Sequence, residues 1–119
     1  MSGEVIGIVV ALSLLGLTLM TGGILALIGR LPYNPVVGIR MASTMRSKAA
    51  WKAGHRSAGP YLLISGLSAL AGAAAAVVMP KADPLALGLI PAAAVVVMLV
   101  IAAVVASRSA LLVPYAETD

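Results

Sequence analysis

Five basic side chains, the only tryptophan and the only histidine lie together in Gly38 to Gly59, a stretch without any acid; the basic residues are Arg40, Arg46, Lys48, Lys52 and Arg56. Guanidinium groups form forked hydrogen bonds with phosphates, and tryptophan prefers the headgroup level of a bilayer. These residue types therefore indicate anion or membrane-surface binding. Catalysis is not expected, because the chain has no cysteine and this stretch has no acid–base pair.

Metal and cofactor binding are not expected either. One histidine without a neighbouring carboxylate or thiolate supplies too few ligands for a metal site. A basic cluster in so apolar a chain also does not predict nucleic acid as a partner. We therefore expect a non-enzymatic protein with no cofactor.

Residues 47–58, SKAAWKAGHRSA, predict a short basic helix that Ser47 caps. At 100° per residue, one arc of roughly 140° holds the aromatic and basic side chains: Lys48, Trp51, Lys52, His55 and Arg56. The other side carries small residues, which allow close packing. We expect the small side to pack on the protein and the aromatic, basic side to face lipid headgroups or a partner.

Each of these side chains has more than one interpretation. The basic cluster fixes membrane topology and binds anionic lipids, or it binds a specific protein or peptide. Trp51 is an interface anchor or a ligand contact, and His55, one helical turn away, is an interfacial polar group or a pH sensor. Arg40 ties its segment to a helix C-terminus or binds a lipid phosphate.

The residues before this helix, RLPYNPVVGIRMA, predict an extended or turning stretch, since two prolines and Gly38 interrupt it. Asn34 before Pro35 favours a turn. At the other end of the basic helix, Gly59 and Pro60 predict a break or a sharp kink.

The elements around this segment are predicted to cross a membrane. Of the 119 residues, 61% are hydrophobic and 10% charged, and the mean hydropathy is +1.09. A soluble surface needs more charge than this. Each of three apolar stretches reaches the ~20 residues of a spanning helix: Val5 to Ile28, Pro60 to Met79 and Leu85 to Ala106. The predicted fold is a single all-α domain with three transmembrane helices.

Local signals refine the last span and the orientation. Asp83 is a good N-cap, Pro84 suits the first helical position, and Pro91 should kink the helix. Because segment 30–59 carries six of the eight basic residues, we expect it in the cytoplasm, with the N-terminus outside and the C-terminus inside. The first span lacks a basic n-region and an A-x-A site, so we expect it to be retained.

The second span is rich in small residues, which form two stripes: Ser65, Ala69 and Ala73, and Ser68, Gly72 and Ala76. Such stripes allow close helix contacts, either within the molecule or in a homo-oligomer or larger complex. The spans carry no carboxylate, which argues against a proton-coupled exporter.

The order of residues in the basic segment resembles the SdpI family of small bacterial membrane proteins. The resemblance rests on Asn34, the Gly-Ile-Arg at 38–40, Thr44, Ser47, Trp51, His55 and Gly59. It implies a site that includes Asn34, Gly38 and Arg40, in a bacterial cell membrane. The chain resembles a short form with only the family's C-terminal unit. Relatives often carry acids between the Ser and the Trp, where this chain has Lys48, Ala49 and Ala50, which favours an anionic partner.

The resemblance implies protection against a secreted toxic peptide, since the family's best-known member protects its producer in this way and holds a transcription repressor at the membrane. Here this implies contact with the peptide through the 30–59 segment. A second interpretation is a small accessory subunit that stabilises a larger membrane complex, which would suit the small-residue stripes equally well.

Overall fold

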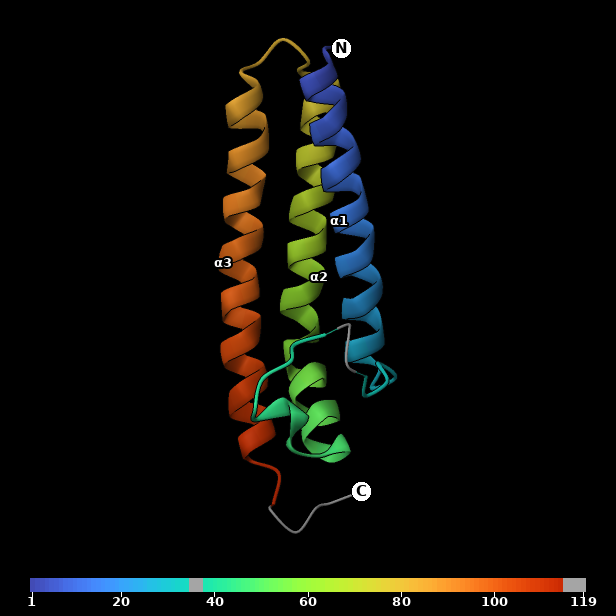
Figure 1. The fold of residues 1–119 in the computed structure, drawn as a ribbon, viewed down its shortest axis with the longest axis vertical. Helices are drawn as coiled ribbons and strands as arrows, with labels where there is room; N and C mark the ends of the chain where they lie inside the picture. The colour runs from blue at the N-terminus through green and yellow to red at the C-terminus, as the bar shows by residue number, and fades with distance from the viewer. Residues whose placement is uncertain (35–37, 115–119) are drawn as a thin grey trace.

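Three long helices run side by side along a molecule of 56 × 20 × 20 Å (Figure 1). The computed structural model describes residues 1–34 and 38–114, and in this part of the chain the elements are α1 (Gly3–Leu27), the 3-10 helix η1 (Thr44–Arg46), α2 (Lys48–Val78) and α3 (Pro84–Leu111). Each of the three α-helices is long and apolar enough to cross a membrane. The predicted all-α membrane fold with three spans is confirmed.

The middle helix holds the bundle together. Figure 1 shows α2 between α1 and α3, and α2 packs extensively against both while α1 and α3 touch each other little. The buried core therefore consists of two helix–helix interfaces on different sides of α2.

Small residues on α2 allow these close approaches. A Cβ on Gly66 would lie 2.9 Å from the Met20 nitrogen of α1, and one on Gly72 would lie 2.5 Å from Pro91 Cβ of α3. Ser65, Ala69, Ala73 and Ala76 are buried as well. Both predicted small-residue stripes thus serve contacts within the molecule, because α2 has two neighbours.

The prediction of a separate basic helix is wrong, because residues 48–58 are the first turns of α2. Ser47 caps this longer helix, as expected for the shorter one, and its Oγ accepts the Ala50 N–H at 3.0 Å. The expected break at Gly59 and Pro60 is absent, since α2 runs through both residues, and a kink there stays a prediction. Gly59 is held by α1, since a Cβ there would lie 2.9 Å from Leu27 Cα, and Pro60 lies on the exposed side.

The turn between α2 and α3 has the predicted cap. Asp83 Oδ1 accepts the Leu85 N–H at 3.1 Å, and Pro84 is the first residue of α3. Pro91 lies inside α3, which continues past it. The kink at Pro91 stays a prediction.

Residues 28–47 form the connector between α1 and α2. Its described residues, 28–34 and 38–47, lie with the C-terminal end of α3 at one end of the molecule (Figure 1). We call this the connector end. The N-terminus and the α2–α3 turn lie at the opposite end. The basic residues of segment 30–59 are therefore collected at one end in space, as they are in sequence.

Candidate functional site

A buried threonine fixes the middle of the connector. Thr44 is fully buried, and its Oγ1 accepts the Met41 N–H at 3.0 Å and donates to the Ile39 carbonyl at 2.7 Å. These bonds fold residues 39–44 into a compact turn that leads into η1. Thr44 therefore has a structural role, because its hydroxyl holds the connector backbone in this turn.

Two aromatic rings from the first turns of α2 support the rest of the connector. Trp51 and His55 are each 1% exposed, and their ring centroids lie 4.1 Å apart at a tilt of 34°. Trp51 Nε1 donates to the Leu31 carbonyl at 3.0 Å. The Tyr33 and Trp51 rings make a T-shaped contact with their centroids 5.4 Å apart, and the Tyr33 hydroxyl donates to the Met45 carbonyl at 3.0 Å.

The histidine uses one ring nitrogen to bond the connector and the other to bond the backbone of α2. The Ile39 N–H donates to His55 Nε2 at 2.9 Å, so this nitrogen carries no proton. The Nδ1 atom lies 2.7 Å from the Trp51 carbonyl, which only accepts, and therefore carries the hydrogen. The hydrogen-bond partners assign a neutral imidazole with its proton on Nδ1.

Glycine is required at position 38 for two reasons. Its φ of +118° is strained for residues with a Cβ. A Cβ there would also lie 2.8 Å from His55 Nε2 and 2.8 Å from Trp51 Cη2. Gly38 therefore lets the connector backbone lie directly on the two rings.

Only part of the predicted exposed face of the basic helix is exposed. Lys48, Lys52 and Arg56 are exposed, as expected, but Trp51 and His55 point into the protein, so their expected position at the headgroups is wrong. The small residues Ala50, Gly54 and Ala58 are buried against the protein, as predicted. The physical reason is that the connector folds back over α2 and covers the two rings.

Two other predicted site residues lie on the connector itself. Arg40 is exposed, and Asn34 is half-buried with its Nδ2 donating to the Pro32 carbonyl at 2.6 Å. The turn predicted at Asn34 and Pro35 lies partly outside the described residues. Arg40 and Asn34 are thus on the surface of the connector, whereas Gly38, Trp51 and His55 form its support.

An arginine that the sequence did not single out fastens the connector to α3. Arg46 Nη2 donates to the carbonyl of Ala110, in the last turn of α3, at 2.7 Å and to that of Val113, just after the helix, at 2.8 Å. Ser43 and Ser107 add a hydroxyl–hydroxyl bond of 2.9 Å. Arg46 thus makes the helix C-terminal contact that was one interpretation of Arg40. No local sequence signal identifies this role, because the two acceptors are 64 and 67 residues further along the chain.

A small apolar cavity of about 280 Å³ lies beneath the connector. All three helices and the connector line it: Thr18, Leu19, Gly22, Gly23, Leu31, Gly38, Ile39, Leu62 and Leu99. Thr18, on the α1 side of the lining, is exposed. The Thr18 hydroxyl donates to the Leu14 carbonyl at 2.8 Å, which leaves the lining mostly apolar.

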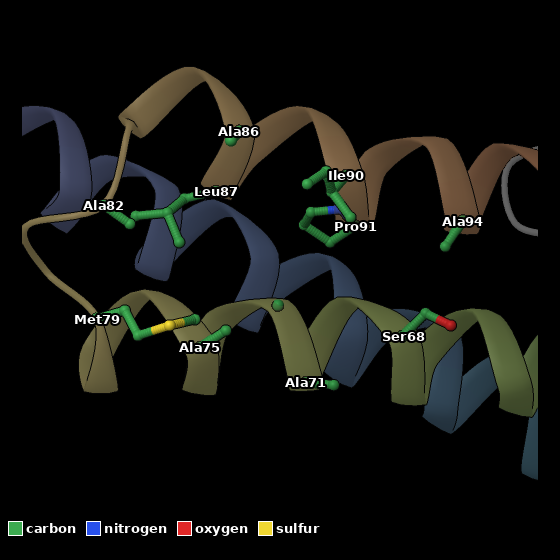
Figure 2. A pocket seen from close by; sticks show the side chains of 11 residues that line it. Ser68, Ala71, Ala75, Met79, Ala82, Ala86, Leu87, Ile90, Pro91 and Ala94 are labelled. Atoms are coloured by element: carbon green, nitrogen blue, oxygen red, sulfur yellow. The ribbon is translucent and has the colours of Figure 1, made fainter.

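A larger groove of about 440 Å³ lies between α2 and α3 toward the opposite end. Figure 2 shows Ile90 and Pro91 of α3 facing α2, with Met79 and Leu87 near the turn. Its lining is apolar except for Ser68, whose hydroxyl donates to the Ile64 carbonyl at 2.9 Å. The groove contains none of the residues predicted for the site.

The comparisons with known proteins agree with this geometry. The model of the SdpI/YfhL protein family matches residues 30–108, from the start of the connector to the last turn of α3. No curated protein and no solved structure matched the chain. Because the family match covers well over half of the sequence and includes every residue of the connector pattern, the chain belongs to the SdpI/YfhL family.

Proposed function

We propose that this chain is a non-enzymatic SdpI-type membrane protein that protects a bacterial cell against a membrane-active toxic peptide or senses it. The observation that carries the proposal is the position of the family pattern. Gly38, Trp51 and His55 hold the connector over a cavity that all three helices line. The position of the family pattern next to this apolar cavity supports recognition of a ligand over a purely structural role.

The cavity suits a peptide that arrives through the membrane. Its lining is mostly apolar, and exposed Thr18 and half-buried Gly22 of the membrane-spanning helix α1 are part of it. A bilayer-embedded apolar side chain would enter there without crossing water. The exposed Arg40 and Lys48 at the same end offer cationic contacts for a negatively charged partner.

The charge distribution supports an orientation as well. The connector end carries most of the basic residues, and basic loops stay in the cytoplasm. We therefore place the connector end and the C-terminus in the cytoplasm of a bacterial cell, and the N-terminus outside. In this orientation the cavity lies in the inner half of the bilayer.

A pair of glycines in α1 gives a direct test. No atom lies within 4 Å of a Cβ placed on Gly22, which lines the cavity, or on Gly7, which is near the opposite end. Leucine at either position improves helix propensity by about 1 kcal/mol, so neither change should unfold α1. We would express Gly22→Leu, Gly7→Leu and the parent chain in a bacterium that lacks SdpI-family proteins. The cells are then challenged with a purified membrane-active toxic peptide of the kind that the best-known family member resists.

The expected result is that the parent chain and Gly7→Leu preserve growth and membrane potential, whereas Gly22→Leu does not. Equal sensitivity with and without the parent chain would contradict the proposed function. Equal protection by both variants would remove the cavity from the mechanism. Purification in mild detergent tests the accessory-subunit interpretation, which requires a larger membrane protein at fixed stoichiometry.

A further inference from the structure

The turn that ends α1 brings basic side chains of two helices together. Gly29 follows α1 with a φ of +74°, and a Cβ there would lie 2.8 Å from Lys52 Cε and 3.4 Å from Arg56 Cδ. The aliphatic stems of these two α2 side chains therefore lie against the turn. Arg30 is the next residue of the chain, so three exposed cations surround one turn.

The backbone N–H groups of the turn are bonded to carbonyls of α1. The Gly29 N–H donates to the Ala26 carbonyl at 3.1 Å, and the N–H groups of Arg30 and Leu31 donate to the Leu25 carbonyl at 2.8 and 3.1 Å. Among residues 1–34 and 38–114, the acids are Glu4 and Asp83, and both lie at the opposite end. Three like charges held together in this way favour an external anion.

The surface next to the cations is apolar. Along the same side of α2, Lys52 and Arg56 are followed by exposed Pro60 and by Leu67, which is 54% exposed. On α1, Leu27 and Ile24 are 41% and 48% exposed beside the turn. A cationic cluster at a helix end with an apolar strip leading toward the bilayer centre matches an amphiphile with an anionic head.

We propose that Arg30, Lys52 and Arg56 bind the phosphate of an anionic phospholipid whose acyl chains lie along Leu27, Pro60 and Leu67. The arginines supply planar forks for the phosphate oxygens, and Lys52, held over Gly29, supplies a point charge. The apolar strip distinguishes this ligand from free phosphate, which would use only the cations. The site is separate from the cavity under the connector and does not depend on the proposed function.

The test compares two double variants that remove the same charge from the same end. Lys52→Gln with Arg56→Gln removes cations of the site and keeps long side chains, whereas Arg40→Gln with Arg108→Gln removes exposed cations of the connector and of the last turn of α3. Each protein is reconstituted into nanodiscs with phosphatidylglycerol diluted in phosphatidylcholine. It is then released into detergent, and native mass spectrometry counts the retained phosphatidylglycerol. Trp51 fluorescence confirms that each variant keeps the folded connector.

The expected result is roughly thirtyfold weaker phosphatidylglycerol retention in the Lys52 and Arg56 variant, and little change in the Arg40 and Arg108 variant. Millimolar inorganic phosphate should not displace the lipid. Equal loss in both variants would show a diffuse surface attraction and overturn the site. Displacement by inorganic phosphate would assign the cluster to free phosphate instead. Because no toxic peptide is used, either result is independent of the protection assay.

Discussion

The backbone N–H of Ile39 donates to Nε2 of His55 across 2.9 Å, and this bond joins the connector to the first turns of α2. It requires a neutral imidazole, because the protonated ring has no acceptor. The histidine of the family pattern is thus an acceptor for backbone rather than an exposed charge. The bond has two partners, the His55 ring nitrogen and the Ile39 amide, and each can be probed separately.

Replacing His55 should release the Ile39 amide in a graded way. In His55→Gln the side-chain oxygen reaches toward the position of Nε2, so part of the bond should persist. In His55→Leu the Ile39 amide loses its acceptor, and we expect its protection against hydrogen exchange to fall by about 1 kcal/mol or more. Exchange at Ile39 measured by NMR in detergent would check this order. Identical exchange in the parent and both variants would contradict the assigned bond.

Gly38→Ala should disturb the connector more than a glycine substitution elsewhere. The new Cβ meets both rings at 2.8 Å, and the positive φ adds strain of roughly 1 kcal/mol or more. Trp51 is the only tryptophan, so its emission reports on this site. We expect a red shift in Gly38→Ala and none in Gly7→Ala, whose new Cβ meets nothing within 4 Å. An unshifted spectrum with an intact fold would mean that the connector does not lie on the rings.

Arg46→Gln should loosen the end of α3. It removes the charge-assisted bonds to Ala110 and Val113, and we expect local protection of residues 107–113 to fall by about 2 kcal/mol. The exposed Arg40 provides the control, since Arg40→Gln removes the same charge without these bonds. Hydrogen exchange with mass spectrometry compares the C-terminal peptide in both. Equal loosening would attribute the effect to net charge.

Gly72→Ala should weaken the contact between α2 and α3. The new Cβ would lie 2.5 Å from Pro91 Cβ, and the proline ring cannot rotate away. We expect destabilisation of about 1–3 kcal/mol, as for other overpacked cores. In Gly7→Ala the same change meets open space and should stabilise by up to about 1 kcal/mol. Thermal unfolding in detergent compares the two, and a stable Gly72→Ala protein would argue against this close packing.

The sequence predicted those features that depend on local chemistry. The lengths of the apolar stretches are enough to identify three spanning helices, and Ser47 and Asp83 are caps because their side chains bond residues two or three positions ahead. The direction of the Trp51 and His55 side chains does not follow from local chemistry. A helical projection groups them with Lys48, Lys52 and Arg56, and it does not show where along that arc burial begins.

The missing information lies in other parts of the chain. Trp51 bonds to Leu31 and His55 to Ile39, which are 20 and 16 residues earlier, so only the folded connector determines which side of α2 is covered. The contacts of Arg46 likewise depend on the folded chain, because its acceptors lie at the C-terminal end of α3 and just after it. The uninterrupted course of α2 through Pro60 depends on the packing of Gly59 against Leu27. These are tertiary contacts that no local pattern reports.

The anchoring of Arg46 has a consequence for the order of biosynthesis. Its two carbonyl partners are 64 and 67 residues further along the chain, so a ribosome makes the connector long before it makes the anchor. During that interval the connector rests on α2 alone. Completion of α3 then supplies the anchor, and a nascent chain that stops before Ala110 would lack both carbonyl partners of Arg46.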